Sequence, residues 1–251
     1  MRHTFFTTTC FVLLVLAAGC GAARAQHAPP PAGAGRTCVA GTFQRLGSAS
    51  LAYAGFVRKR AAVSHRPGGP VFARFGRRNV YRVPTIFSVR GMRVDARCRA
   101  AFYLVQIPKR PNGVTGWVVA RQLGVARLRT RIIVDLSEKR VTLFRAGKPV
   151  LRATAAIGSP ATPTPTGSFY VNQRLIPSDR SGPYGPGAIG ISAFSNVLTG
   201  WAQGGPIAIH GTNAPWSIGK AVSNGCIRLP NPVVRRLFRE ALGGTPVVIR
   251  R

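Results

Sequence analysis

Acidic side chains are scarce in this sequence. Five Asp and Glu stand against 36 Lys and Arg in 251 residues, which gives a formal net charge of +31. This imbalance excludes an acidic solvating tail and predicts an anionic partner, whether nucleic acid, a membrane surface or an acidic polymer. Charged residues make up only 16% of the chain and hydrophobic residues 45%. There is therefore enough apolar side chain to form a core, and disorder of the whole chain is not expected.

The sequence also lacks a long hydrophobic run near its start. The uncharged stretch from Cys10 to Ala18 follows a cationic start and precedes small residues, and it is shorter than the ~20 residues needed to span a bilayer. This pattern predicts a cleaved signal peptide over residues 1–25, and so an exported protein. A lipoprotein signal ending at Cys20 is the alternative. Residues 26–37 are rich in Pro, Gly and Ala, which predicts a flexible linker.

Cysteine is sparse as well, and its count is informative. Removal of a signal peptide leaves Cys38, Cys98 and Cys226, an odd number for an oxidising compartment. The two cysteines of the N-terminal half are the natural disulfide pair. Cys226 then remains a free thiol, which is either buried and inert or kept for reactivity.

Residues 38–126 carry short β-type runs and almost no helical periodicity. Turn clusters rich in Gly and Pro separate these runs, which predicts a small SH3-like β-barrel. No Cys/His or acidic cluster occurs here, so we expect a binding or spacer module without chemistry. The expected strands are residues 51–57, 71–75, 86–89, 101–107 and 116–119.

A second unit is predicted over residues 130–251, again mainly β. The proline-rich segment 158–167 cannot be a helix and is a poor strand, so we expect an extended surface loop. The Gly/Pro-rich stretch 177–187 is a candidate mobile lid, with Tyr184 as a candidate substrate-binding residue. The expected strands are residues 132–136, 141–144, 150–157, 168–172, 206–209 and 247–249.

One helix is predicted near the end of the chain. Asn231 is a suitable N-cap, Pro232 suits the first helical position and Gly243 supplies the stop. Arginines occupy the polar face, where a solvated surface is a commoner meaning than a nucleic-acid stripe. The apolar face is Val234, Leu237, Phe238, Ala241 and Leu242, at helical spacing.

The reactive side chains concentrate between residues 206 and 229. A short apolar strand ends at His210 and Gly211, and Cys226 follows 16 positions after the histidine. A cysteine nucleophile needs a base nearby because a free thiol has a pKa of ~8.5. Gly225 lets the chain turn sharply and leaves its amide free to face a bound carbonyl. Zinc is the other use of His and Cys, but no second close-spaced ligand pair occurs, so we expect neither a metal nor a cofactor.

Four segments resemble the L,D-transpeptidase catalytic domain of bacterial cell-wall enzymes, over about residues 130–250. They are His210-Gly211-Thr212-Asn213, Ser223-Asn224-Gly225-Cys226-Ile227-Arg228-Leu229, Pro163-Thr164-Pro165-Thr166-Gly167 and Gly244-Thr245-Pro246-Val247-Val248-Ile249. The resemblance implies a β-rich catalytic fold. The N-terminal half looks like the accessory β module of exported actinobacterial members of this kind.

The resemblance also implies roles for single residues. Cys226 would be the nucleophile and His210 its base. Ser223, Asn224, Gly225 and Gly211 would shape the oxyanion region, and Arg228 would hold the site or an anionic substrate group. Many members have histidine where this chain has Asn224, so a mechanism with a second histidine there is not expected.

The implied reaction is acyl transfer through a thioester. Cys226 would attack the third residue of a peptidoglycan stem tetrapeptide, D-alanine would leave, and an amine would take the acyl group. The chain offers no obvious carboxylate to orient His210, so a backbone carbonyl, such as that of Gly211, is expected to do so. Two alternatives stay open: a carboxypeptidase that passes the thioester to water, and a non-catalytic arginine-rich binder of wall polyanions. Export and the absence of aromatics among the basic clusters disfavour nucleic acid.

Overall fold

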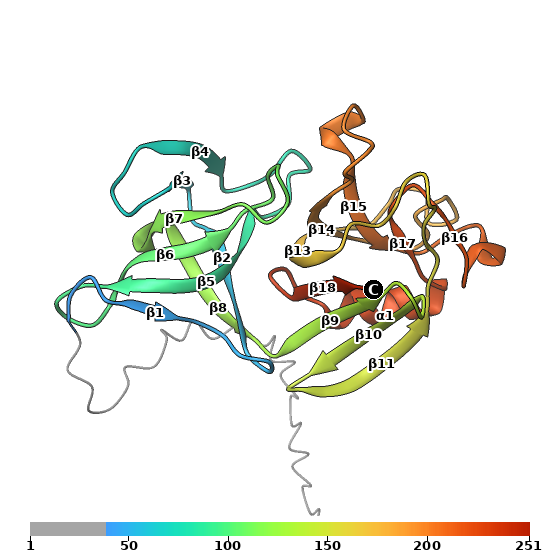
Figure 1. The fold of residues 1–251 in the computed structure, drawn as a ribbon, viewed down its shortest axis with the longest axis horizontal. Coiled ribbons are helices and arrows are strands. Elements are labelled where there is room, and N and C mark those ends of the chain that lie inside the picture. The colour runs from blue at the N-terminus through green and yellow to red at the C-terminus, as the bar shows by residue number, and fades with distance from the viewer. Residues whose placement is uncertain (1–38) are drawn as a thin grey trace, which may run out of the picture.

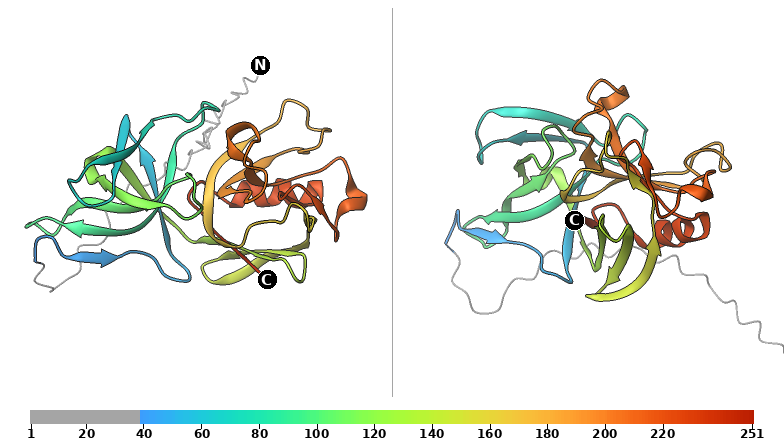
Figure 2. Two further views of the ribbon diagram at one scale, coloured as in Figure 1. Left: turned by 45° about the horizontal axis from the view of Figure 1, so that its top comes forward. Right: turned by 45° about the vertical axis from the view of Figure 1, so that its right-hand side comes forward.

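The computed structural model describes residues 39–251, which form two β-rich units lying side by side (Figure 1). The same two units remain distinct in the turned views of Figure 2. The predicted signal peptide, the lipoprotein cysteine Cys20, the linker and Cys38 all lie outside the described residues. These 213 residues form one α-helix and many strands. The fold is therefore mainly β, as the sequence predicts.

The N-terminal unit is one eight-stranded sheet in the order β4-β3-β7-β6-β5-β2-β8, with β1 also paired to β5. Its pairings are antiparallel, and β5 is the longest strand. The strands are β1 (Phe43–Arg45), β2 (Ala52–Val57), β3 (Arg60–Ser64), β4 (Val71–Gly76), β5 (Ile86–Val94), β6 (Ala100–Gln106), β7 (Thr115–Val119) and β8 (Leu123–Leu128), with a 3-10 turn at Ala120–Gln122.

This unit has its own apolar core. Phe87, Val105 and Val118 are fully buried in it, because alternate side chains of each strand face the same side of the sheet. All five predicted strands are present, and β1, β3 and β8 were not predicted. The closer assignment to an SH3-like barrel stays a prediction. Cys98 is disulfide-bonded, and its pairing with Cys38 stays a prediction.

The C-terminal unit contains a second eight-stranded sheet, in the order β11-β10-β9-β18-β13-β14-β15-β17, and the small parallel pair β12-β16. The last strand, β18, lies in the middle of the sheet, parallel to β9 and antiparallel to β13. The strands are β9 (Thr130–Asp135), β10 (Arg140–Arg145), β11 (Lys148–Thr154), β12 (Ile157–Gly158), β13 (Gly167–Leu175), β14 (Ala188–Phe194), β15 (Pro206–His210), β16 (Ala221–Ser223), β17 (Ile227–Arg228) and β18 (Pro246–Arg250), with 3-10 turns at Ala202–Gly204 and Pro215–Ser217.

The helix α1 (Asn231–Glu240) packs its apolar face on this sheet, with Val234 and Leu237 fully buried in the core. Two details of the predicted helix are wrong. The N-cap is Pro230, not Asn231, because the Asn231 side chain instead accepts a hydrogen bond from the Thr212 amide at 2.9 Å. The helix ends at Glu240, and Leu242, predicted on the buried face, is 47% exposed.

The two units are joined without a spacer. β8 ends at Leu128 and β9 begins at Thr130, so Arg129 alone connects them. Hydrogen bonds then cross the junction at several places. Asn112 pairs with the Phe194 backbone in both directions, at 2.8 and 2.9 Å, and the buried Tyr170 hydroxyl donates to the Ile86 carbonyl at 3.2 Å.

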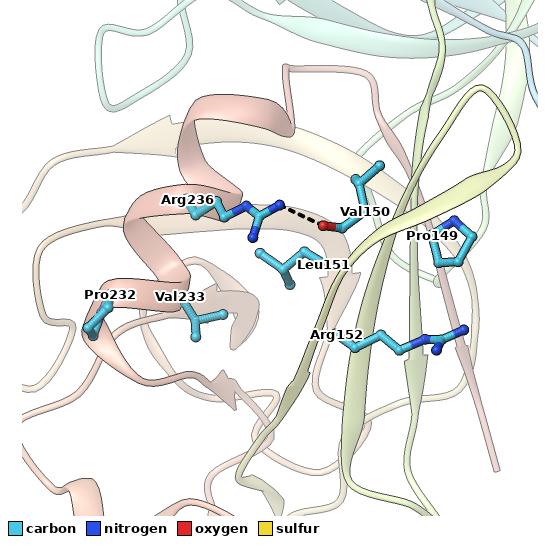
Figure 3. Close-up of a pocket in the computed structure, with 7 residues that line it drawn as sticks. All are labelled: Pro149, Val150, Leu151, Arg152, Pro232, Val233 and Arg236. Atoms are coloured by element: carbon cyan, nitrogen blue, oxygen red, sulfur yellow. Dashed lines mark hydrogen bonds between the residues drawn. The ribbon is translucent and has the colours of Figure 1, made fainter.

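A cavity of about 390 Å³ lies between β11 and α1, where Arg236 donates a hydrogen bond to the Val150 carbonyl at 2.7 Å (Figure 3). It holds no nucleophile or acid. Across residues 39–251, we find no helix that combines the length and apolar character needed to cross a membrane.

Candidate active site

His210 is the last residue of β15, which lies between β14 and β17 in the sheet. Its side chain is 4% exposed. The ring Nδ1 lies 2.5 Å from the carbonyl oxygen of Gly211. Because a carbonyl only accepts, Nδ1 must carry the proton, and Nε2 of the neutral ring is left as the free base. The prediction that a backbone carbonyl, that of Gly211, orients His210 is therefore confirmed.

Cys226 lies directly before β17, which runs parallel to β15 with Ile227 opposite Ile209. This register puts Cys226 level with Ala208, whose backbone hydrogen-bonds to the thiol. Ala208 and His210 are two residues apart on one strand, so their side chains face the same side of the sheet. Cys226 and His210 therefore lie on one face of neighbouring strands, and Cys226 is a free cysteine.

Burial keeps both groups uncharged at neutral pH. It raises the pKa of the Cys226 thiol, an effect that the Ala208 hydrogen bond and the Arg228 charge only partly offset. Burial is also the main reason that the pKa of His210 falls to about 4, with the Arg228 charge lowering it further. The resting pair is therefore thiol and neutral imidazole. The imidazole can accept the thiol proton only when a substrate carbonyl takes up the sulfur's electrons.

The turn before the nucleophile is held by one hydroxyl. Ser223 Oγ donates to the Cys226 carbonyl at 2.6 Å and accepts from the Gly225 amide at 3.1 Å. The Gly225 amide is thus engaged within the turn, and its predicted role as an oxyanion donor, which would require this bond to break, stays a prediction. Within residues 39–251 the Cys226 amide has no hydrogen-bond acceptor. It is the amide left to meet an oxyanion.

Gly225 is needed for its backbone conformation, since its φ of +105° is one that side-chain-bearing residues rarely adopt. A Cβ there would also lie 3.0 Å from the Ile207 side chain. The expected sharp turn next to Cys226 is present.

Thr164 is a site-building residue that the sequence did not single out. Its buried hydroxyl donates to the Gly225 carbonyl at 2.9 Å and accepts from the Gly158 amide at 2.8 Å. The neighbouring Thr162 hydroxyl donates to the Ser223 carbonyl at 3.0 Å. Residues 159–166 of the proline-rich segment form the expected loop, while Gly158 ends β12 and Gly167 begins β13. Two threonines of this loop hold the nucleophile turn in place. The alternation of Pro and Thr was the one signal in the sequence, and it did not indicate which hydroxyl turns inward.

Gly211 allows three segments to meet behind His210. A Cβ on this residue would lie 2.4 Å from Asn231 Oδ1 and 2.8 Å from the Pro186 ring. Asn231 Oδ1 in turn accepts from the Thr212 amide. The start of α1 and the loop before β14 therefore pack closely against Gly211. Any side chain at this position would overlap with them.

Two predicted substrate-binding residues lie beside the pair. The ring of Tyr184, in the loop between β13 and β14, lies 4.9 Å from the His210 ring between centroids, and the side chain is half exposed. Arg228 is close enough for its charge to lower the pKa of both His210 and Cys226. Within the described residues its guanidinium has no hydrogen bond or ion pair, so it is available to an anionic group.

Other candidates stand apart from this pair. Asn224 is exposed, and neither nearby carboxylate reaches the histidine: Asp179 accepts from Ser181, and Glu240 pairs with Arg145. No group of three or more metal-ligating side chains is found in the described part of the chain.

Comparison with known proteins identifies the class of this unit. Residues 129–249 match the family model YkuD, described as an L,D-transpeptidase catalytic domain. A putative L,D-transpeptidase of Bacillus subtilis is 38% identical over 48% of this chain and 65% of its own length. A probable L,D-transpeptidase of Escherichia coli is 29% identical over 60% of this chain and 41% of its own. This chain thus spans less than two thirds of these relatives.

Among solved structures, a cysteine-to-serine mutant of Enterococcus faecium L,D-transpeptidase is 28% identical, with a TM-score of 0.38, over 48% of this chain and 49% of that one. The cysteine and histidine on neighbouring strands lie within the segment that matches this family. With the family match, residues 129–249 are an L,D-transpeptidase catalytic domain of the YkuD family.

Proposed function

We propose that the protein is an L,D-transpeptidase that forms peptidoglycan cross-links through a Cys226 thioester. The observation that carries this proposal is the uncharged Cys226 and His210 pair on one face of β15 and β17, with His210 Nδ1 fixed on the Gly211 carbonyl. The family match and the relatives named L,D-transpeptidases support it. Peptidoglycan stem peptides are the proposed substrates.

The first half-reaction forms the thioester. The Cys226 thiol gives its proton to His210 Nε2 as sulfur attacks the carbonyl carbon of the third residue of a stem tetrapeptide. The Cys226 amide donates to the oxygen that gains charge. The C–N bond to D-alanine then breaks, the leaving nitrogen takes the proton from His210, and a thioester remains.

The second half-reaction transfers the acyl group. An amine on another stem attacks the thioester carbonyl, and His210 accepts the proton that this nitrogen must lose. The C–S bond breaks, the sulfur recovers a proton from His210, and the thiol is regenerated. Hydrolysis by water in place of the amine would give the carboxypeptidase alternative.

Covalent labelling with imipenem tests the nucleophile. A carbapenem should add its mass to the protein, and Cys226→Ala should abolish the adduct. His210→Ala should slow acylation at least a hundredfold, because it removes the general base. An adduct that survives Cys226→Ala would refute the assignment.

Product analysis tests the acceptor. Incubation with stem tetrapeptide should yield cross-linked dimer with release of D-alanine. Trimmed tripeptide alone would identify a carboxypeptidase instead, and neither product, with salt-sensitive polyanion binding, would identify the non-catalytic alternative.

Export is proposed on the predicted signal peptide over residues 1–25, with attachment to the wall or membrane favoured by the +31 charge. Anionic wall polymers are the proposed second partner, since a cationic surface attracts them without specific contacts.

A further inference from the structure

A cavity of about 740 Å³ lies between the two units, away from Cys226 and His210. Strands of the N-terminal sheet line one side, and β9, β13 and β18 of the catalytic domain line the other. Its volume is within the range of small-molecule sites. None of the residues assigned to catalysis contributes to it.

Three arginines line this cavity without a balancing acid. Arg45, Arg90 and Arg131 are close enough for the other two charges to lower the pKa of Arg90, beyond the effect of its burial. All five carboxylates of the protein lie elsewhere. Uncompensated like charges in a partly buried site oppose folding, and a bound anion would reverse that effect.

The guanidinium groups keep donors to spare. Arg131 donates to the Ser48 carbonyl at 2.8 Å, but its Nε is buried and has no partner within the described residues. Arg90 donates to Gln106 Oε1, and Gln106 Nε2 donates to the Ser168 carbonyl at 2.9 Å. Arg45 is exposed and has no hydrogen bond through its side chain in the described part of the chain. A buried donor without an acceptor is costly, and an anion bound beside Arg131 would supply the missing acceptor.

The rest of the lining is mixed. One part is apolar, from Leu46, Leu51, Leu104 and Phe169, and another part is polar, from Ser48, Ser88, Gln106, Thr115 and Ser168. Three forked cations suit a tetrahedral oxyanion, because phosphate offers more acceptor oxygens than a carboxylate does. The volume exceeds that of one phosphate ion, and the apolar wall suits a carbon skeleton. We propose that this cavity binds a phosphate monoester of a small polyol, with Arg45, Arg90 and Arg131 contacting the phosphate.

Calorimetric titration of the full chain with glycerol 3-phosphate, at a fixed 0.15 M salt to screen the overall charge, tests this proposal. We expect saturable binding at one site per chain. Arg45→Gln and Arg131→Gln should each weaken binding at least tenfold, whereas Arg74→Gln, an exposed arginine of β4 away from the cavity, should change it less than twofold. Arg45→Gln keeps the test valid if Arg131→Gln fails to fold.

Three results would overturn the site. If glycerol bound with the same affinity as glycerol 3-phosphate, the arginines would have no role in binding. Equal weakening by Arg74→Gln would reduce the effect to general charge attraction. Inorganic phosphate binding as tightly as the ester would remove the role of the apolar wall. Binding is measured without reference to Cys226 chemistry, so its failure leaves the proposed function untouched.

Discussion

His210 and Cys226 are each shifted toward the neutral form, and this decides how the pair reacts. A pre-formed thiolate and imidazolium would need polar surroundings, but burial is the main cause of both shifts. The thiolate therefore exists only in passing, when the carbonyl is in place. An idle enzyme of this kind keeps a poorly nucleophilic sulfur, which protects it from adventitious oxidation.

The first prediction concerns the pH dependence of acylation. The base must be neutral, and the pKa of His210 is lowered from 6.5 to about 4. The imipenem acylation rate should therefore hold as pH falls from 7 to 5 and drop as it passes through about 4. Stopped-flow measurement of the acylation rate at each pH checks this. The reaction of imipenem with a small thiol, measured at the same pH values, corrects for changes in the drug itself. An inflection near 6.5 would show that the histidine is not desolvated in the resting enzyme.

At the scale of elements, the proline-rich loop between β12 and β13 fastens the nucleophile turn. Thr164 makes this link across 61 positions of sequence through one hydroxyl. Proline fixes the loop's backbone in advance, so little entropy is lost in presenting that hydroxyl. Rigidity of the Cys226 turn thus depends on a segment that carries no reactive group.

Replacement of Thr164 by Val tests this link. The change keeps the shape of the side chain but leaves the buried Gly158 amide and Gly225 carbonyl without a partner. We expect a loss of about 2 kcal/mol in the free energy of unfolding and at least tenfold slower acylation. Thr166→Val, on the exposed side of the same loop, is the matched control. Unchanged acylation in Thr164→Val would show that the turn holds its geometry unaided.

The loop carrying Tyr184 contributes to the burial of His210, because the two rings are in contact. Tyr184→Ala should hydrate the imidazole and move the acid inflection of acylation up from about 4 toward 6.5. Tyr184→Phe keeps the ring and should leave the inflection in place. If the inflection of Tyr184→Ala does not move, the desolvation comes from the strands and not from this loop.

The spacing of apolar residues predicted the helices and strands that have a clear periodicity. It missed elements that lack one. The helix was found from its apolar spacing, yet its first residue was misassigned because Asn231 serves a distant amide. The unpredicted β14 is almost wholly buried on both faces, so it lacks the alternation that identifies a strand. Cys226 and His210 were found because their residue types are rare and reactive. Thr164 was not, since its partners are distant in sequence.

At the scale of the whole molecule, the sequence could not place the two units relative to each other. Many contacts across the junction end on backbone carbonyls, such as those of Ser195 and Gly204, which accept from Arg110. Every residue has a backbone carbonyl, so the sequence does not indicate which carbonyls accept these hydrogen bonds. The direct step from β8 to β9 and these bonds make the units one structural body.

Asn112→Ala tests this coupling. The variant loses both hydrogen bonds to the Phe194 backbone and should lower the free energy of unfolding by about 2 kcal/mol. Urea titration measures this change, and Asn213→Ala, an exposed asparagine without such bonds, is the control. An Asn112→Ala protein as stable as the control would mean that the junction contributes little to folding.

The position of β18 determines when the catalytic sheet can form during synthesis. β18 follows β9 and β13 in the sequence, yet it lies between them in the sheet and is one of the two strands paired with each (Figure 1). The catalytic sheet therefore cannot close while residues 246–250 are still in the ribosome. The sheet of the N-terminal unit contains only β1 to β8. This unit can therefore fold before the catalytic sheet is complete. A truncated chain would keep the nucleophile but not the sheet that presents it.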